Sequence, residues 1–201
     1  MATVGSGLAE LPATAVARRA AQVCRRYSTS AFAGHSFRSY LWAAESARSR
    51  GLAYDEELLF VAAMVHDLGL SRTWDAHVTP FEVVGAELGR VLCLGAGWPP
   101  ERAARVSEIC VLHMRDEVTP HVDAESHLLQ VGTSADVSGV GAMDFPEDFR
   151  AALLEAHPRT GFPHEFVEAF RGEAGRKPGC AAAQLLATDW PHRMRMNPLP
   201  G

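Results

Sequence analysis

The chain has 201 residues, of which 47% are hydrophobic and 21% are charged, and its formal net charge at pH 7 is -5. This composition is ordinary for a water-soluble globular protein, and the length fits one domain built around one core. The 19 basic residues are scattered along the chain, so the sequence argues against a nucleic-acid partner or an anionic membrane surface.

Helical signals dominate the chain. Apolar spacing and capping residues predict helices over about 14–27, 35–51, 55–68, 80–94, 99–115 and 124–137, with shorter ones at 146–156, 163–171 and 180–190. Asp55 is the expected N-cap of the third helix, and Gly51 ends the second. No stretch alternates with period two between hairpin turns, so strands should be few or absent.

The predicted fold class is therefore all-α. One helical domain is expected over 13–190, with a flexible N-terminus at 1–12, a loop at 172–179 and a C-terminal tail at 191–201. Residues 1–12 lack the basic region and apolar run of a signal peptide, and the longest apolar stretch, 58–65, is too short for a bilayer. A cytoplasmic protein is expected, without a membrane partner. Its widely spaced cysteines should be buried free thiols: Cys24, Cys93, Cys110 and Cys180.

An adjacent histidine and aspartate end the most apolar helix. Residues 58–65 are hydrophobic without exception, so the helix that His66 and Asp67 complete should be buried nearly all round. An unpaired carboxylate there would cost several kcal/mol. Arg72 is the only basic residue close to it in sequence, so a metal ion is a reasonable source of the missing positive charge.

Three other helices aim metal-ligand types of side chain at the interior. Asp136 shares a helical stripe with residues 129 and 132, and His113 shares one with residues 106 and 109. His35 lies at the expected start of its helix, above Ser39. Each alone is more often a hydrogen-bonded core residue than a ligand. Their convergence on one His-Asp pair points to a metal site.

The order His35, His66-Asp67, Asp136 resembles the H…HD…D signature of HD-domain metallohydrolases. The resemblance covers about residues 30–145 and includes the segments HSFRSYLWA, ELLFVAAMVHDLGL, FEVVGAELGR, ICVLHMRDE and LLQVGTSADVSGVG. Within that superfamily these segments are most similar to the cyanamide hydratase-type branch. The resemblance implies an HD-domain helical bundle with a metal site in its core.

The resemblance also implies that His35, His66, Asp67 and Asp136 hold one divalent metal ion, with zinc the metal of this branch. Two imidazoles and two carboxylates suit zinc, and also iron or manganese. Two-metal HD enzymes add two further histidines before the last aspartate. Only His113 is well placed for such a role here, which favours a single ion.

The function implied is hydration or hydrolysis of a small, mostly uncharged substrate such as cyanamide or a related nitrile or amide, by hydroxide from metal-bound water. His113, assisted by Asp67, would be catalytic by protonating the developing nitrogen anion. Glu82, Arg38 and Trp74 are candidates for substrate binding. Glu82 could instead be an ordinary carboxylate at a helix start. Arg38 could neutralise Asp67 or Asp136 or be solvated, and Trp74 could anchor a turn.

Two other functions remain open. An HD-type phosphohydrolase acting on nucleoside monophosphates would need at least two basic side chains at the metal, and the motif segments offer only Arg38 and Arg72. A non-catalytic HD-like ligand-binding module would bind metal weakly or turn nothing over. The expected partner is a small-molecule substrate, and exposed helix faces could support a homodimer. The sequence assigns no role to the helices after residue 145.

Overall fold

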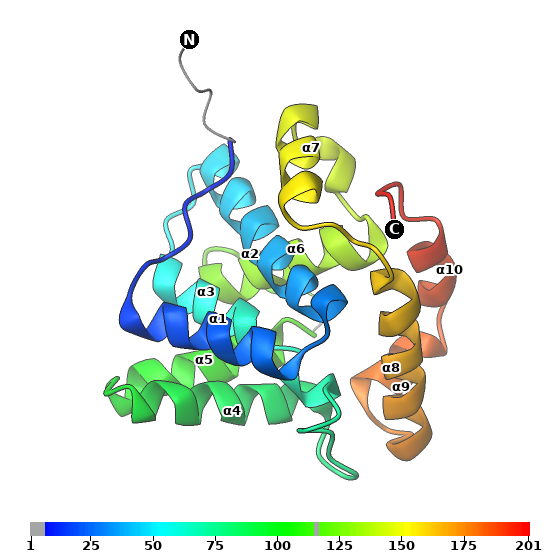
Figure 1. Cartoon of the computed structure of the whole chain (residues 1–201), viewed down its shortest axis with the longest axis horizontal. Helices are drawn as coiled ribbons and strands as arrows, with labels where there is room; N and C mark the ends of the chain where they lie inside the picture. Colours follow the sequence, from blue (N-terminus) through cyan, green and yellow to red (C-terminus); the bar gives the residue numbers. More distant parts are fainter. Residues whose placement is uncertain (1–6, 115–116) are drawn as a thin grey trace.

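The computed structural model describes residues 7–114 and 117–201, which form helices and no strand (Figure 1). The all-α prediction is confirmed. Within these ranges no helix is both long and apolar enough to span a membrane. The α-helices are α1 (Ala15–Tyr27), α2 (Ser30–Arg50), α3 (Glu56–Val65), α4 (Phe81–Gly95), α5 (Pro100–Leu112), α6 (Ala124–Ser138), α7 (Glu147–Ala156), α8 (Phe162–Arg176), α9 (Ala181–Leu186) and α10 (Trp190–Arg195), with 3-10 turns η1 (Leu68–Leu70) and η2 (Ala142–Asp144).

Helix ends follow capping residues that are visible in the sequence. The Asp55 side chain accepts the N–H of Leu58 at 2.9 Å, as expected for the N-cap of α3. Gly51 ends α2 with a φ of 64°, a left-handed conformation that glycine adopts without steric cost. The predicted boundaries of α1, α4, α6 and α7 agree with the structure to within two residues.

Three predicted boundaries, in α2, α3 and α5, differ from the structure. Helix α3 ends at Val65 instead of continuing to residue 68, where the separate turn η1 begins. Helix α2 begins at Ser30 instead of near His35, because the Thr29 side chain accepts the N–H of Phe32 at 3.3 Å and caps the helix there. His35 therefore lies inside α2, on a full turn of helix. The helix expected to end near Arg115 is α5, which ends at Leu112; residue 115 itself lies outside the described residues.

Helices α2 and α3 form the centre of the molecule (Figure 1). Every α3 residue from 58 to 65 is at most 5% exposed, so the apolar run does line a core. Helix α2 is buried on most of its circumference, and Trp42 packs edge-on against Phe145 and Phe149 near α7. This central position places the inward side chains of α2 and α3 beside each other.

Glycine 132 lets α6 approach α2 closely. A Cβ atom built at Gly132 would lie 2.0 Å from the carbonyl oxygen of Ser39, which is part of the α2 backbone. No side chain fits between the two helices at this level. The close approach brings the C-terminal end of α6, with Asp136, next to His35.

Gly132→Ala should therefore destabilise the protein by about 1–3 kcal/mol, because α2 and α6 must move apart to admit the methyl group. Urea unfolding measures the change. Gly95→Ala is the matched control, since a Cβ at Gly95 meets nothing within 4 Å, and it should be neutral or stabilising by up to about 1 kcal/mol. Equal effects of the two substitutions would contradict the steric argument.

Helices α8, α9 and α10 lie together along one side of the molecule, the right-hand side of Figure 1. Their core is aromatic and includes Phe162, Phe166, Phe170 and Trp190. The expected tail at 191–201 begins inside α10, and Leu199 is buried. These residues pack against the helical domain.

Two local predictions in this region are wrong. The glycines at 172 and 175 predict a loop, but α8 continues to Arg176. Buried Glu173 holds this part of the helix in place, because it accepts the N–H of Phe81 at 2.9 Å and pairs with Lys177 at 2.6 Å. The single helix expected over 180–190 is interrupted. Helix α9 ends at Leu186, and α10 starts at Trp190 with a proline in its first turn.

Candidate metal centre

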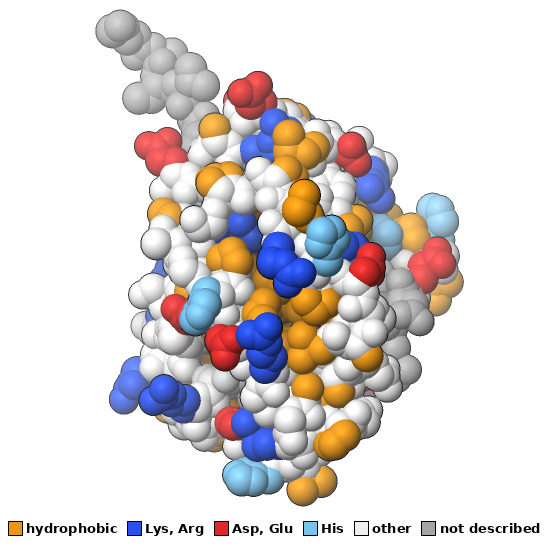
Figure 2. All heavy atoms as spheres, turned by 90° about the vertical axis from the view of Figure 1, so that its right-hand side faces the viewer, with side chains coloured by type: hydrophobic (Ala, Val, Ile, Leu, Met, Phe, Trp, Pro, Cys, Tyr) orange, Lys and Arg blue, Asp and Glu red, His pale blue; other side chains and the backbone are white. Residues whose placement is uncertain are grey.

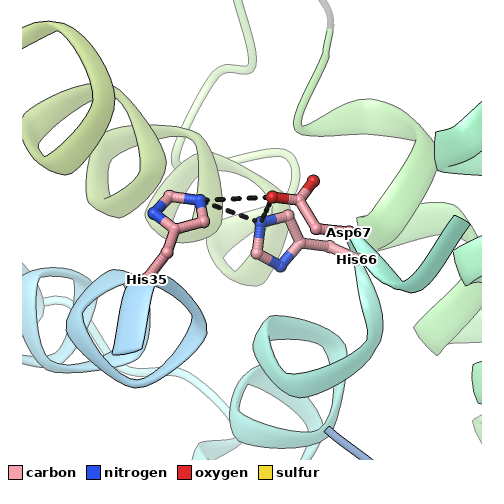
Figure 3. A group of neighbouring side chains, drawn as sticks. All are labelled: His35, His66 and Asp67. Carbon is pink, nitrogen blue, oxygen red and sulfur yellow. Dashed lines mark hydrogen bonds and ion pairs between the residues drawn. The ribbon is translucent and has the colours of Figure 1, made fainter. Parts of the chain in front are cut away.

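Three metal-ligand types of side chain meet between α2 and the end of α3. His35 projects from α2, His66 is the C-cap residue just after α3, and Asp67 follows it (Figure 3). The Nε2 atoms of His35 and His66 are 3.3 Å apart. The Oδ2 atom of Asp67 is 3.4 Å from His35 Nε2 and 3.3 Å from His66 Nε2. All three residues are buried.

The position of the His-Asp pair is set by a second glycine contact. A Cβ at Gly85 of α4 would lie 2.5 Å from the carbonyl oxygen of Val65 and 2.6 Å from that of His66. The backbone of α4 thus packs directly on the backbone that carries the pair. Gly85 belongs to the FEVVGAELGR segment. Because it has no side chain, α4 can pack against the backbone of the turn after α3.

The protonation of the two rings decides what the three converging atoms can bind. His66 Nδ1 lies 2.8 Å from the carbonyl oxygen of Ala63 and must carry a proton, because a carbonyl only accepts. His35 Nδ1 likewise faces the Asp136 carboxylate at 2.7 Å, so both rings turn Nε2 toward Asp67 Oδ2. Burial lowers the pKa of His66, but Asp67 outweighs burial and the pKa is raised. A proton on His66 therefore offsets the Asp67 charge in the metal-free protein, and a metal ion at this position would replace that proton.

The spacing of these atoms suits a divalent metal ion. Zinc binds nitrogen and oxygen at about 2.0–2.2 Å in tetrahedral sites, so two neighbouring ligand atoms are then about 3.3–3.6 Å apart. The three observed distances of 3.3–3.4 Å match one triangular face of such a site. Burial raises the pKa of the Asp67 carboxyl, but the imidazoles of His66 and His35 outweigh it and hold the pKa at about 2. Asp67 is therefore ionised and available as a ligand.

Asp136 lies behind His35, on the Nδ1 side of the ring. Arg38 binds both of its carboxylate oxygens, with Nε and Nη2 at 2.7 and 2.9 Å, and Arg159 Nε is 3.3 Å from Oδ1. Burial raises the pKa of Asp136, yet Arg38 and His35 together keep it well below the usual value. The carboxylate thus fixes the orientation and tautomer of His35. Its direct bond to a metal stays a prediction, and would require giving up one of these contacts.

His113 lines the same cavity as the three clustered residues. Its ring lies edge-on to that of His66, with centroids 5.0 Å apart, and its Nδ1 donates to the carbonyl oxygen of Cys110. Burial and the nearby His66 together lower the pKa of His113 to about 3. His113 is therefore neutral near pH 7, with Nε2 left to accept a hydrogen bond or a proton.

This burial makes the stability of the metal-free protein depend on pH. The unfolded chain takes up a proton at His113 below about pH 6.5, whereas the folded chain does so only near pH 3. Between these values the unfolded state holds more protons, so stability falls as the pH falls. His113→Gln should remove about 1 kcal/mol of the loss between pH 6 and pH 5.

Guanidinium unfolding in the presence of a chelator measures this difference, and the chelator keeps metal binding out of the comparison. His121→Gln is the control, because His121 is exposed, and its pH dependence should follow that of the wild type. A His113→Gln protein with an unchanged pH dependence would show that His113 is not held neutral.

The three residues predicted to bind substrate lie elsewhere. Arg38 is fully buried, and beyond Asp136 it donates to the carbonyl oxygen of Pro158 at 2.9 Å, so it supports the metal centre from behind. Trp74 packs edge-on against Tyr27 with ring centroids 5.3 Å apart. Glu82 is buried at the start of α4 with Oε2 unpartnered, and burial and Glu173 raise its pKa. Their contact with substrate stays a prediction that the cavity wall does not support.

Sequence reasoning missed the wall that faces the cluster. A cavity of about 530 Å³ opens beside His35, His66 and Asp67, and its wall includes side chains of α6, α8, α9 and α10. One signal was available, because phenylalanines recur every four residues along α8 and so form one stripe. The stripe consists of Phe162, Phe166 and Phe170. Nothing in the sequence shows that it faces the metal centre.

The family model described as HD domain matches residues 32–156, a range that contains His35, His66, Asp67, His113 and Asp136. No curated protein matches the chain. Helices α8, α9 and α10 lie beyond the matched range.

Proposed function

The chain belongs to the HD-domain family, whose members are typically metal-dependent hydrolases, and on that premise we propose that it hydrates or hydrolyses an uncharged nitrile or amide. The observation that carries the proposal is the cluster of three buried metal-ligand atoms beside a cavity of about 530 Å³. Cyanamide is the smallest candidate of this chemical class.

The residues present fit a divalent metal ion, for which zinc is proposed. His35, His66 and Asp67 would hold it, which is a catalytic rather than a structural pattern because three protein ligands leave a position open. When bound there, the ion would supply a Lewis acid and lower the pKa of bound water toward neutrality. The protein contributes the orientation of each ligand: Asp136 fixes His35, and the carbonyl oxygen of Ala63 fixes His66.

His113 is the proposed proton-handling residue. Its Nδ1 is engaged by the carbonyl oxygen of Cys110, so the free atom is Nε2. A neutral imidazole in this state accepts a proton first and can then pass it to the nitrogen of the substrate. This order adds a step to the sequence prediction, in which His113 protonates the developing nitrogen anion. The negative charge of Asp67 assists by stabilising the positive charge of His113 while it carries the proton.

An uncharged substrate is favoured over a phosphate ester by the state of the buried arginines. Arg38 and Arg159 are both committed to Asp136, so neither is available to a phosphate dianion beside the cluster. Two further arginines, Arg50 and Arg193, line the cavity at exposed positions, and Arg193 pairs with Asp189 at 3.3 Å. Phosphoryl transfer normally places several cations on the reacting group.

A substrate panel tests the proposal. Zinc-loaded protein should form urea from cyanamide and amides from other nitriles if it is a hydratase, or release ammonia from amides if it is a hydrolase, and a chelator should abolish the turnover. His113→Gln should lower kcat by about 10²–10⁴-fold, as for loss of a general acid-base group. Phosphate release from nucleoside monophosphates without turnover of nitriles or amides would establish the phosphohydrolase alternative. A protein with bound metal and no turnover of either class would be a ligand-binding module.

A further inference from the structure

The cavity beside the metal centre is much larger than the smallest substrate of the proposed class. Its volume of about 530 Å³ falls within the range of about 300–1,000 Å³ that accommodates drug-sized ligands. One water molecule occupies about 30 Å³ in the liquid, so a molecule as small as cyanamide would leave most of the space to solvent. The size of the cavity calls for a substrate with a body as well as a reactive group.

One side of the cavity is an aromatic wall that starts at the metal centre. Phe166 of α8 packs edge-on against the His35 ring, with centroids 5.6 Å apart. Phe170 follows at 4.5 Å from Phe166 and stacks on Trp190 of α10 at 5.1 Å and 18°. Leu185 of α9 also lines this side. We call these four residues, Phe166, Phe170, Leu185 and Trp190, the aromatic wall.

The α6 side of the cavity carries hydroxyl groups beside two valines, Val131 and Val137. Thr133 and Ser138 line it, and each hydroxyl donates to a backbone carbonyl oxygen of its own helix, at 3.1 and 3.0 Å. Their oxygen atoms therefore remain as acceptors and suit an N–H group of a ligand. The cavity thus combines a large apolar surface with a few acceptors, and the three clustered ligand atoms belong to residues of the same cavity.

We propose that the substrate carries an aliphatic or aromatic body that lies against the aromatic wall while its nitrile or amide group lies at the metal centre. This inference rests on the proposed function. The helices α8, α9 and α10 that build the wall occupy the side of the molecule shown in Figure 2, where hydrophobic side chains form a band flanked by charged ones. They also lie outside the residues that match the HD domain.

A series of straight-chain hydroxamates tests the inference by binding, without relying on turnover. A hydroxamate binds zinc through its head, and its alkyl chain can be lengthened one methylene at a time. Calorimetric titration of the zinc-loaded protein should show affinity rising about fourfold per buried methylene until the chain outgrows the cavity. Affinity that does not change with chain length would overturn the inference.

Two variants and a matched control locate the effect. Trp190→Ala should weaken the longer hydroxamates and leave the shortest unchanged, whereas Trp98→Ala should change neither, because Trp98 lies beside Arg102 and not on the cavity wall. Ser134→Leu narrows the cavity from the α6 side without removing a packed side chain. It should weaken long ligands by at least tenfold and spare short ones. Equal effects on long and short ligands in both variants would contradict the proposed position of the body.

The same titrations with chelated protein separate the two proposals. The dependence on chain length could persist in the chelated protein while the zinc-loaded protein turns over no nitrile or amide. In that case the proposed reaction fails and the apolar binding site stands. If short and long hydroxamates bind the zinc-loaded protein equally well and nitriles are turned over, the reaction stands and the apolar body is excluded.

Discussion

Removing the metal should lower the unfolding temperature of the wild-type protein by about 10 °C and leave that of Asp67→Asn unchanged. Binding at a ligand concentration near 1,000 times the Kd stabilises a protein by about 4 kcal/mol, and each kcal/mol shifts the melting temperature of a chain of this size by about 2–4 °C. The substitution removes one of the three ligand atoms and the charge that offsets the dication. Calorimetry with and without chelator measures the shift.

Plasma mass spectrometry provides the stoichiometry for this comparison, on protein purified without an affinity metal column. We expect about one zinc per wild-type chain and less than about one tenth in Asp67→Asn. Asp144→Asn, which changes an exposed carboxylate, is the control and should retain the metal. Two equivalents of iron or manganese per chain would refute the mononuclear site.

The second large effect is expected at Arg38, whose loss should cost about 3–5 kcal/mol of stability, as for breaking a buried ion pair. Arg38 is fully buried, binds both oxygens of Asp136 and also reaches the backbone before α8. Arg38→Ala leaves a buried carboxylate with fewer partners. Arg38→Lys keeps the charge but loses the bidentate contact, so its stability should lie between that of the wild type and that of Arg38→Ala.

Urea unfolding of the chelated proteins measures this loss independently of metal binding. Arg90→Ala is the control, because Arg90 forms an exposed pair with Glu87 at 2.9 Å, and such pairs contribute at most about 1 kcal/mol. A loss of less than 1 kcal/mol in Arg38→Ala would mean that Arg159 and His35 suffice to balance Asp136. Zinc affinity should fall about 10–100-fold in Arg38→Ala, as for removal of a group that orients a ligand.

The sequence predicted which side chains cluster at the metal centre better than it predicted the contacts that hold them in place. His35, His66 and Asp67 do meet, because helical stripes and the apolar run of α3 already direct them to one core. The position of Asp136 behind His35 was not predictable in the same way. It depends on Arg38, one turn beyond His35, and on Arg159, which comes from the loop before α8 and has no periodic relation to the site.

The aromatic wall shows a different limit of sequence reasoning. The stripe of phenylalanines on α8 predicts a buried face, but a stripe does not tell which core it joins. The answer comes from contacts between distant parts of the chain, such as that between Glu173 and the N–H of Phe81, which fix α8 beside α4. Glycines within α8 concealed its length for the same reason, since their cost to the helix is offset by tertiary packing.

Arg159 has a consequence for the order in which the protein can mature during synthesis. Its guanidinium donates to Asp136 O at 2.7 Å and to the carbonyl oxygens of Leu199 and Pro200 at 3.2 and 3.1 Å. Domains fold progressively as the chain leaves the ribosome, and residues 32–156 emerge well before residue 200. The nascent HD segment can therefore gather its histidines early and Arg159 can join Asp136 soon afterwards, but the hydrogen bonds from Arg159 to Leu199 and Pro200 form only once those residues have left the ribosome.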